Sequence, residues 1–323
     1  MRKWKTLLMT LLVGVTSYAN ANTGLFTFEA GYRRDDITWK HEFPSNHPVV
    51  SSSTKFEDLD IFQIGVQARS TIGCNFYVRG SAYWGWIVDG NFKRDVGSYF
   101  TPSGYGYSAP DSNFRLGFSD DRRSIIDDKY VYGIAGAVGY PFYFCDCTTV
   151  LAPVIGYAYD QQTVRVDNQG FNFSQSGGYI CPGSGEGNNC CRQTFLSRWY
   201  GPFVGLDLNY NPWDACWNLY ADLEYHWGDF RGKRSHGDGF DFFDHRNLSS
   251  HDATGWLFTV GGEYELCNEW VVGLSLKWQD WNASRHHRNS GYSGESYWSG
   301  NNRARNENKW HSFAVNFTFG RDF

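Results

Sequence analysis

The sequence lacks the marks of several large classes of protein. Beyond residue 21 it has no run of about 20 apolar residues, the length that a helix needs to cross a bilayer, so a helical membrane protein is excluded. It has no block of basic residues that could follow a phosphate backbone, and nucleic acid is not an expected partner. No cysteine lies near residue 21, so a lipoprotein anchor is not supported. These absences leave a membrane barrel open, because each barrel strand needs only about 9–11 residues of alternating polarity.

The first residues have the pattern of a secretory signal peptide. A basic start is followed by an apolar run from Leu7 to Val15, and the small residues of a cleavage site end at Ala21. The apolar run is too short to span a bilayer as a helix. We expect residues 1–21 to direct export and to be removed, and residues 22–323 to form one domain.

Aromatic residues are abundant, at 19% of the chain, with 14 tryptophans and 21 tyrosines. This exceeds what filling a core requires, and membrane barrels concentrate such residues in girdles at both water interfaces. Alternate positions from Phe313 to Phe319 are apolar, and the chain ends on Phe323. Such a strand resembles the terminal signal that the assembly machinery of bacterial outer-membrane barrels reads. The resemblance implies that Phe323 is an assembly signal and that outer-membrane lipid surrounds the chain.

Ten segments alternate between apolar and polar residues, as strands with two different faces do. They lie near 24–40, 56–69, 76–88, 128–142, 149–165, 197–210, 217–229, 253–266, 270–282 and 309–323. Short connections lie near 70–75, 143–148, 211–216 and 267–269, and long ones near 41–55, 89–127, 166–196, 230–252 and 283–308. Short and long alternate strictly, which is the rhythm of an up-and-down barrel with short periplasmic turns and long outer loops. A soluble β-sandwich would not sort its connections by length in this way. The expected fold class is therefore all-β, a transmembrane antiparallel barrel in the bacterial outer membrane.

The polar face of these strands becomes the interior of the predicted barrel. Its charged residues of both signs include Glu29, Arg33, Arg79, Asp207, Asp222, Glu224, Glu263 and Lys277. Buried charges must pair or stay hydrated. Eight strands just enclose packed side chains and sixteen or more leave an aqueous channel, so ten strands predict a narrow or filled bore. A charge network that fills the bore and a path for permeation both fit this pattern.

The eight cysteines are concentrated in the connections. The five in or beside the short turns are Cys74, Cys145, Cys147, Cys216 and Cys267, and the three in one long loop are Cys181, Cys190 and Cys191. An oxidising compartment favours disulfides, but each set is odd, so at least one thiol on each side is free or bonds another molecule. Local disulfides and cross-links to other envelope proteins, or to a second copy, both stay open. The turns contain no histidine that could complete a metal site, so no metal or other cofactor is expected.

The strand count and loop rhythm resemble those of the omptins, which are ten-stranded outer-membrane proteases. The resemblance implies a site with two aspartates after the third strand and an Asp-x-His after the seventh. Here Asp89 matches the first acid, but Asn91 stands at the second, and Arg234 rather than an acid precedes His236 by two residues. An aspartate orients and charges the imidazole that activates water, and an arginine cannot do so. The residues therefore predict that the chain is not an enzyme, with Asp89 and His236 as the weak catalytic candidates.

Several stretches are similar to the Protochlamydia outer membrane protein family, barrels of chlamydia-like bacteria. They are Gly31–Trp39, Tyr77–Gly90 and Pro153–Tyr159. The resemblance implies an outer-membrane protein, a porin in at least one case, from cells whose envelopes contain disulfide-linked proteins. The sequence then favours a narrow channel or a structural envelope barrel cross-linked through its turn cysteines. The alternatives are an omptin-like surface protease and a non-conducting adhesin or surface barrel.

Overall fold

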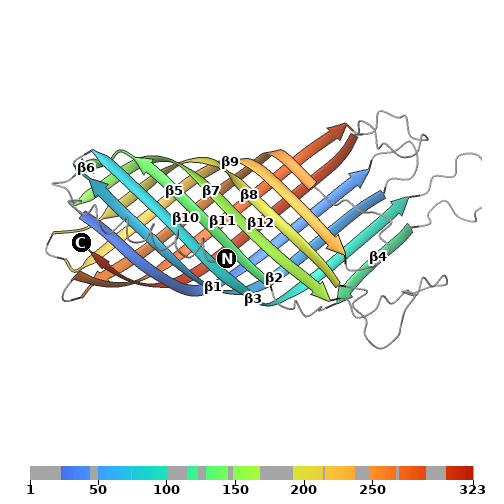
Figure 1. Ribbon diagram of the computed structural model, residues 1–323, viewed down its shortest axis with the longest axis horizontal. Helices are drawn as coiled ribbons and strands as arrows, with labels where there is room; N and C mark the ends of the chain where they lie inside the picture. The colour runs from blue at the N-terminus through green and yellow to red at the C-terminus, as the bar shows by residue number, and fades with distance from the viewer. Residues whose placement is uncertain are drawn as a thin grey trace, which may run out of the picture.

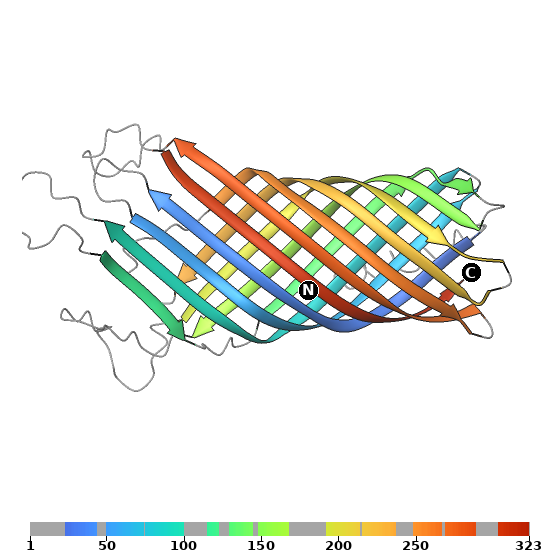
Figure 2. The same ribbon diagram turned by 180° about the vertical axis from the view of Figure 1, so that it is seen from behind.

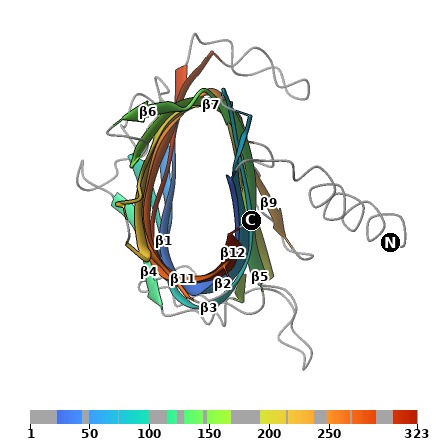
Figure 3. The same cartoon turned by 90° about the vertical axis from the view of Figure 1, so that its left-hand side faces the viewer.

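Ten long strands form the wall of a closed antiparallel barrel. The computed structural model describes residues 23–43, 50–73, 75–99, 115–122, 129–144, 148–167, 192–213, 215–236, 248–266, 269–288 and 303–322. The wall strands are β1 (Thr23–Phe43), β2 (Val50–Ile72), β3 (Phe76–Tyr99), β5 (Lys129–Gly139), β7 (Thr149–Asp167), β8 (Arg192–Tyr210), β9 (Trp217–His236), β10 (Leu248–Glu265), β11 (Trp270–Arg288) and β12 (Arg303–Asp322). The strands cross the long axis obliquely (Figure 1 and Figure 2), and the outline along that axis is oval (Figure 3).

Backbone pairing runs without a break around the wall. Each wall strand pairs with the next along the chain, and the circle closes between β1 and β12, where Leu25 lies opposite Asp322. Closure leaves no wall strand with an unpaired edge, which a bilayer requires because it offers no water to peptide groups. The predicted ten-stranded all-β barrel is confirmed. Within the described residues, no helix is long and apolar enough to cross a membrane.

Two short strands accompany the wall. β6 (Phe142–Phe144) pairs with β7, as β5 does, and it follows β5 after an interruption at Tyr140 and Pro141. Proline cannot donate to a ladder, which accounts for the interruption. β4 (Arg115–Arg122) pairs with the far end of β3. It lies in the segment near 89–127, where the sequence predicts a loop, and that prediction is wrong for this part.

The strands run past their predicted ends at the long connections. β1 and β2 stay paired out to Phe43 and Val50, so most of the predicted loop near 41–55 is strand. The predicted loops near 230–252 and 283–308 are shortened at both ends in the same way. Where the outer face of a strand meets water it carries polar residues, and the apolar alternation on which the prediction rests disappears.

The two ends of the barrel differ. One end, here called the short-turn end, holds the short connections, and β12 ends there (Figure 1). Gly73 follows β2 at this end with φ +61°, a backbone conformation that glycine adopts without strain. The opposite end holds the long connections and is called the long-connection end. The predicted signal segment 1–21 and Phe323 lie outside the described residues.

The outer face of the wall carries an apolar band. Its exposed aliphatic and phenylalanine side chains include Phe28, Phe62, Ile64, Ile134, Ile155, Val204, Leu206, Leu223, Val260, Leu274, Leu276, Val315 and Phe317. Stacked rings flank this band on both sides. The ring centres of Trp84 and Tyr130 lie 4.8 Å apart toward the long-connection end. Those of Trp270 and Phe319 lie 4.9 Å apart toward the short-turn end. An apolar band between aromatic girdles is the surface that a membrane barrel presents to lipid.

Candidate functional site

A layer of apolar side chains, here called the apolar plug, fills the interior toward the long-connection end. All ten wall strands contribute to it, and its members are at most 7% exposed. They are Ile37, Trp39, Phe56, Leu59, Ile61, Ile87, Phe92, Val131, Val164, Val166, Phe195, Trp199, Phe230, Ala253, Trp281, Ala283 and Trp310. Side chains from the whole circumference thus occupy the cross-section that a channel would need.

Three tryptophans and a phenylalanine form the centre of the plug. The ring of Trp199 lies 4.5 Å from Phe230, 5.7 Å from Trp281 and 6.2 Å from Trp310. All four side chains are at most 1% exposed. Rings at these separations gain from the area that they bury and from their mutual geometry. Loss of one ring would therefore leave a cavity in a closely packed layer.

The plug lies where the outer face of the wall changes from apolar to polar. On β11 the outward residues Leu274, Leu276 and Trp278 are exposed, and the next outward residue is Asp280. The inward neighbour of Asp280 is the buried Trp281. The barrel is thus apolar outside along the band and polar outside beyond it. Its interior is apolar at the plug, and along the band it is mostly polar with a small apolar cluster of Ala137, Ala152, Val154, Ala158 and Phe203. The part beyond the band is built like the core of a water-soluble protein.

A backbone bulge keeps apolar side chains inward in this part. β2 bulges at Asp58, which has φ +56° and whose N–H donates to Asp36 at 2.7 Å. Ile61 and Phe56 on either side of the bulge are both buried in the plug. They are five positions apart, so strict alternation would have turned Phe56 to the outside.

Next to the plug, toward the short-turn end, the interior becomes polar. Nε and Nη2 of Arg33 each donate to Asp35 at 2.7 Å, and both side chains are at most 3% exposed. Gln162 donates to the same carboxylate at 3.0 Å. The guanidinium lies 5.0 Å from the ring centre of Tyr83, whose hydroxyl donates to Asp160 at 2.6 Å. Arg33 and Asp35 thus form a hydrogen-bonded ion pair, as burial requires, and Asp160 accepts a hydrogen bond from a neutral hydroxyl.

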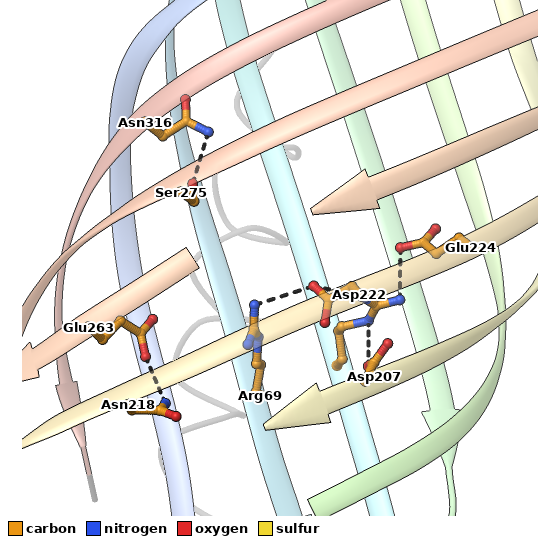
Figure 4. A network of polar contacts seen from close by, with 9 residues as sticks. Arg69, Asp207, Asn218, Asp222, Glu224, Glu263, Ser275 and Asn316 are labelled. Carbon is orange, nitrogen blue, oxygen red and sulfur yellow. Dashed lines mark hydrogen bonds and ion pairs between the residues drawn. The ribbon is translucent and has the colours of Figure 1, made fainter. Parts of the chain in front are cut away.

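Arg79 is the centre of a charge network nearer the short-turn end, and Figure 4 shows its acidic partners. Its Nη2 donates to Glu224 at 2.8 Å, while Nε and Nη1 lie 3.2 Å from Asp207 and 3.3 Å from Asp222. Glu224 is also hydrogen-bonded to Nε2 of His226 at 2.7 Å. One guanidinium thus serves three buried carboxylates.

A cavity of about 320 Å³, here called the vestibule, lies at the short-turn end of the interior. Its charged lining residues are Arg69, Asp207, Asp222, Glu263, Glu265 and Asp322. Arg69 lies 3.4 Å from Asp222 and 3.8 Å from the ring centre of Tyr220. Glu263 accepts a hydrogen bond from Asn218 at 3.2 Å (Figure 4).

The structure places all eight charges of the predicted interior set on the inner side of the wall. Those that are at most 5% exposed are Arg33, Asp207, Asp222, Glu224 and Glu263. The side chain of Arg79 is 8% exposed. Glu29 and Lys277 line, together with Arg79, a smaller cavity of about 50 Å³.

The two weak catalytic candidates lie on strands that are not neighbours. Asp89 is an exposed residue of β3 whose carboxylate accepts from the N–H of Gly90 at 2.8 Å. His236 is the last residue of β9 and lies opposite Gln193 of β8. The wall strands β5, β7 and β8 separate β3 from β9 in one direction around the barrel. Nothing in the backbone pairing joins these two residues.

Of the eight cysteines, Cys216 lies within the described residues. It is exposed, is free of disulfides there, and lines the vestibule. The other predicted cross-link positions, Cys74, Cys145, Cys147, Cys181, Cys190, Cys191 and Cys267, lie outside the described residues. Among the residues that the structure describes, no group of three or more His, Cys, Asp or Glu side chains could hold a metal ion.

The plug is the feature that sequence reasoning missed. Trp199, Trp281 and Trp310 occupy inward positions of their strands, as the interior polar residues do. That shared parity was the available signal, because the predicted segments 197–210, 270–282 and 309–323 already contain these tryptophans.

A family model described as Protochlamydia outer membrane protein matches residues 27–323. The chain belongs to this family. Membership confirms the resemblance seen in the sequence, and with the barrel it confirms the predicted location in the bacterial outer membrane. No curated protein matches the chain.

This family member is similar to several solved structures at low identity. The outer membrane protease OmpT from Escherichia coli is 13% identical with a TM-score of 0.55, and the match covers 91% of this chain and 96% of OmpT. The outer membrane protein OprG from Pseudomonas aeruginosa is 11% identical, with a TM-score of 0.34 and coverage of 93% and 96%. The toluene transporter TodX of Pseudomonas putida is 9% identical, with a TM-score of 0.29 and coverage of 92% and 89%. The likeness to OmpT extends to the barrel fold alone.

Proposed function

We propose that this family member is a closed surface barrel that does not conduct and that holds its long connections outside the cell. In this proposal the short-turn end faces the periplasm, as short turns do in bacterial outer-membrane barrels. The observation that supports a closed barrel is the apolar plug, because every wall strand contributes to it. The apolar band provides the contact with outer-membrane lipid.

The plug favours a closed barrel over the narrow channel for a physical reason. An ion that crossed it would lose its water shell and find apolar side chains in its place, which costs several kcal/mol or more. Hydrophobic constrictions in channels close pores by excluding water. A channel would require the plug to be displaced first. We also propose that the barrel is not an enzyme, since Asn91 and Arg234 stand where the omptin site has aspartates.

A structural role in the envelope is proposed for the thiol at the short-turn end. Cys216 is exposed there, and the periplasm is oxidising. An exposed thiol in such a compartment exchanges readily with other thiols and disulfides. We therefore propose a disulfide between Cys216 and another envelope protein or a second copy of this chain.

Conductance of the refolded protein in a planar bilayer tests the closed barrel. The wild-type protein is expected to give no unit conductance steps. A variant with Trp199, Trp281 and Trp310 replaced by serine loses the centre of the plug and is expected to conduct. The matched control replaces the lipid-facing Trp256 and Trp278 by serine and should stay silent. Regular unit steps from the wild-type protein would contradict the proposal.

A further inference from the structure

We propose that the outer wall binds the phosphate group of a membrane lipid through Arg198 of β8 and Arg231 of β9. The two strands are neighbours in the wall (Figure 1), and the two arginines lie directly opposite each other. Both face outward, because the adjacent residues Trp199 and Phe230 point into the plug. This inference goes beyond the closed-barrel proposal and does not depend on whether the barrel conducts.

The two arginines bring positive charge together without an acid to balance it. Like charges directly opposite each other on neighbouring strands repel and destabilise the pairing. Within the described part of the chain, neither guanidinium forms an ion pair with a carboxylate. The acids on the adjoining outer face of β9 and β10 are Asp229 and Asp252, and Asp229 is hydrogen-bonded to His251 at 2.7 Å. Lys233 adds a further exposed cation on β9. A bound anion would remove the repulsion.

An outward-facing glutamine holds Arg198 in place. Nε of Arg198 donates to Oε1 of Gln161 at 3.0 Å. The hydroxyls of Tyr132 and Tyr159 donate to the same oxygen at 3.1 Å and 2.9 Å, and Gln161 is only 5% exposed although it lies on the outer side of β7. Because this contact uses Nε, the two terminal nitrogens of the guanidinium stay available for two oxygens of a phosphate, which arginine binds in a bidentate manner.

The two arginines lie at the level of the aromatic girdle toward the long-connection end. The ring of Tyr132 lies 5.6 Å from Trp84 of that girdle and 5.9 Å from Tyr159. Tyr159 lies 6.1 Å from Tyr200, and the guanidinium of Arg231 lies 5.4 Å from the ring centre of Tyr200. Aromatic girdles lie at the level of the lipid headgroups. The arginines are therefore at the depth at which lipid phosphates lie.

The apolar band next to the arginines favours a lipid over a soluble phosphate. On β8 the outward residues Val204 and Leu206 follow Tyr200 toward the short-turn end, and both are exposed. A lipid that places its phosphate on the arginines can lay its acyl chains along this surface. The bilayer also holds such a headgroup beside the site, which raises its effective concentration over that of a phosphate in solution.

Native mass spectrometry of the refolded full chain in detergent tests the site. The probes are dioleoyl phosphatidic acid, dioleoylglycerol without the phosphate, glycerol 3-phosphate without the chains, and a phosphoserine peptide. Phosphatidic acid is expected to bind saturably and about tenfold or more tightly than dioleoylglycerol. Equal binding of the two lipids would overturn the phosphate contact. Competition by glycerol 3-phosphate or the peptide at the same concentration as the lipid would assign the site to a soluble phosphate and overturn the lipid.

A double variant and a matched control locate the binding. Arg198→Gln together with Arg231→Gln is expected to weaken the binding of phosphatidic acid about tenfold or more. The control, Arg34→Gln together with Arg321→Gln, removes the same charge from two outward arginines that are paired with acids, and it should bind as the wild type does. Unchanged affinity in the folded double variant, or an equal loss in the control, would overturn the placement. If the double variant failed to fold, Arg231→Gln alone at its exposed position decides by the same criterion.

Discussion

At the scale of single residues, the buried carboxylates of the interior are stabilised by a few cations, each of which forms ion pairs with one or more of them. Arg79 lies within 3.3 Å of three carboxylates, and the set is almost fully buried. Breaking such a network by removing one partner is far more costly than losing a pair at the surface, because the remaining charges stay buried without compensation. The stability of the barrel should therefore be concentrated in these residues.

Replacing Arg79 by methionine is expected to lower the free energy of unfolding by about 3–5 kcal/mol. Denaturant unfolding of the refolded barrel in detergent, followed by tryptophan fluorescence, measures the change. The matched control is Arg34→Met, which removes an ion pair to Asp58 whose two side chains are about half exposed. This control should cost about 1 kcal/mol or less. Similar costs at the two positions would show that the Arg79 network contributes little.

The interior charges could be predicted from the sequence, but their neighbours in the plug could not. Lys277 and Trp281 lie on the same face of β11, and the period of two identifies that face correctly. Alternation along a strand shows which side chains point inward, but it does not show which side chains they contact there. Here Lys277 points into a polar interior, and Trp281, four residues later, points into an apolar layer. On β2 the bulge at Asp58 changes the parity itself, and no composition signal in the sequence marks it.

At the scale of elements, the strands that extend beyond the apolar band, such as β11, contain two zones with opposite polarity. In the membrane zone the outer face is apolar because it meets lipid, and beyond that zone it is polar because it meets water. The inner face changes in the opposite sense. A strand that is interpreted as one uniform amphipathic segment therefore appears to stop where the polarity changes. This explains why β1 and β11 were predicted to end too early, and β2 and β12 to begin too late.

Lysine substitutions along β11 should reveal the change of polarity. In the membrane zone, Leu276→Lys faces lipid and is expected to cost about 2–4 kcal/mol, while the inward Ser275→Lys joins a polar cavity and costs less. Beyond that zone the order reverses. Trp281→Lys in the plug should cost about 3–5 kcal/mol, and the outward Asp280→Lys little. Unfolding measurements that give the same order at both places would contradict the two-zone description.

At the scale of the whole molecule, the number of wall strands and their order followed from the rhythm of short and long connections. Ten segments of alternating polarity gave the ten wall strands, since each short turn forces neighbouring strands to pair. β4 did not follow, because it pairs outside the apolar band and lacks the alternation that lipid contact imposes. The sequence therefore predicts the part of the barrel that contacts lipid and misses the part that contacts water.

Non-reducing gels of native envelopes test the proposed cross-link. Species of higher mass that collapse to the monomer with reductant are expected, because Cys216 is an exposed thiol at the short-turn end. A Cys216→Ser variant should lose some of these species, and replacing all five turn cysteines should remove them. The control replaces Cys181, Cys190 and Cys191 and should leave the species in place. Monomer alone without reductant would contradict the cross-link.

The apolar plug also keeps salt ions from the long-connection end away from the charged part of the interior. The vestibule lies at the short-turn end, so the salt ions that screen its charges come from the solution at that end. In the proposed orientation that solution is the periplasm. At about 0.15 M salt, charges are screened over about 8 Å, and dilution lengthens this distance. The network around Arg79 would thus respond to periplasmic salt and not to the medium outside the cell. A cell moved between dilute and salty water would keep the electrostatics of this interior constant as long as its periplasm stayed constant.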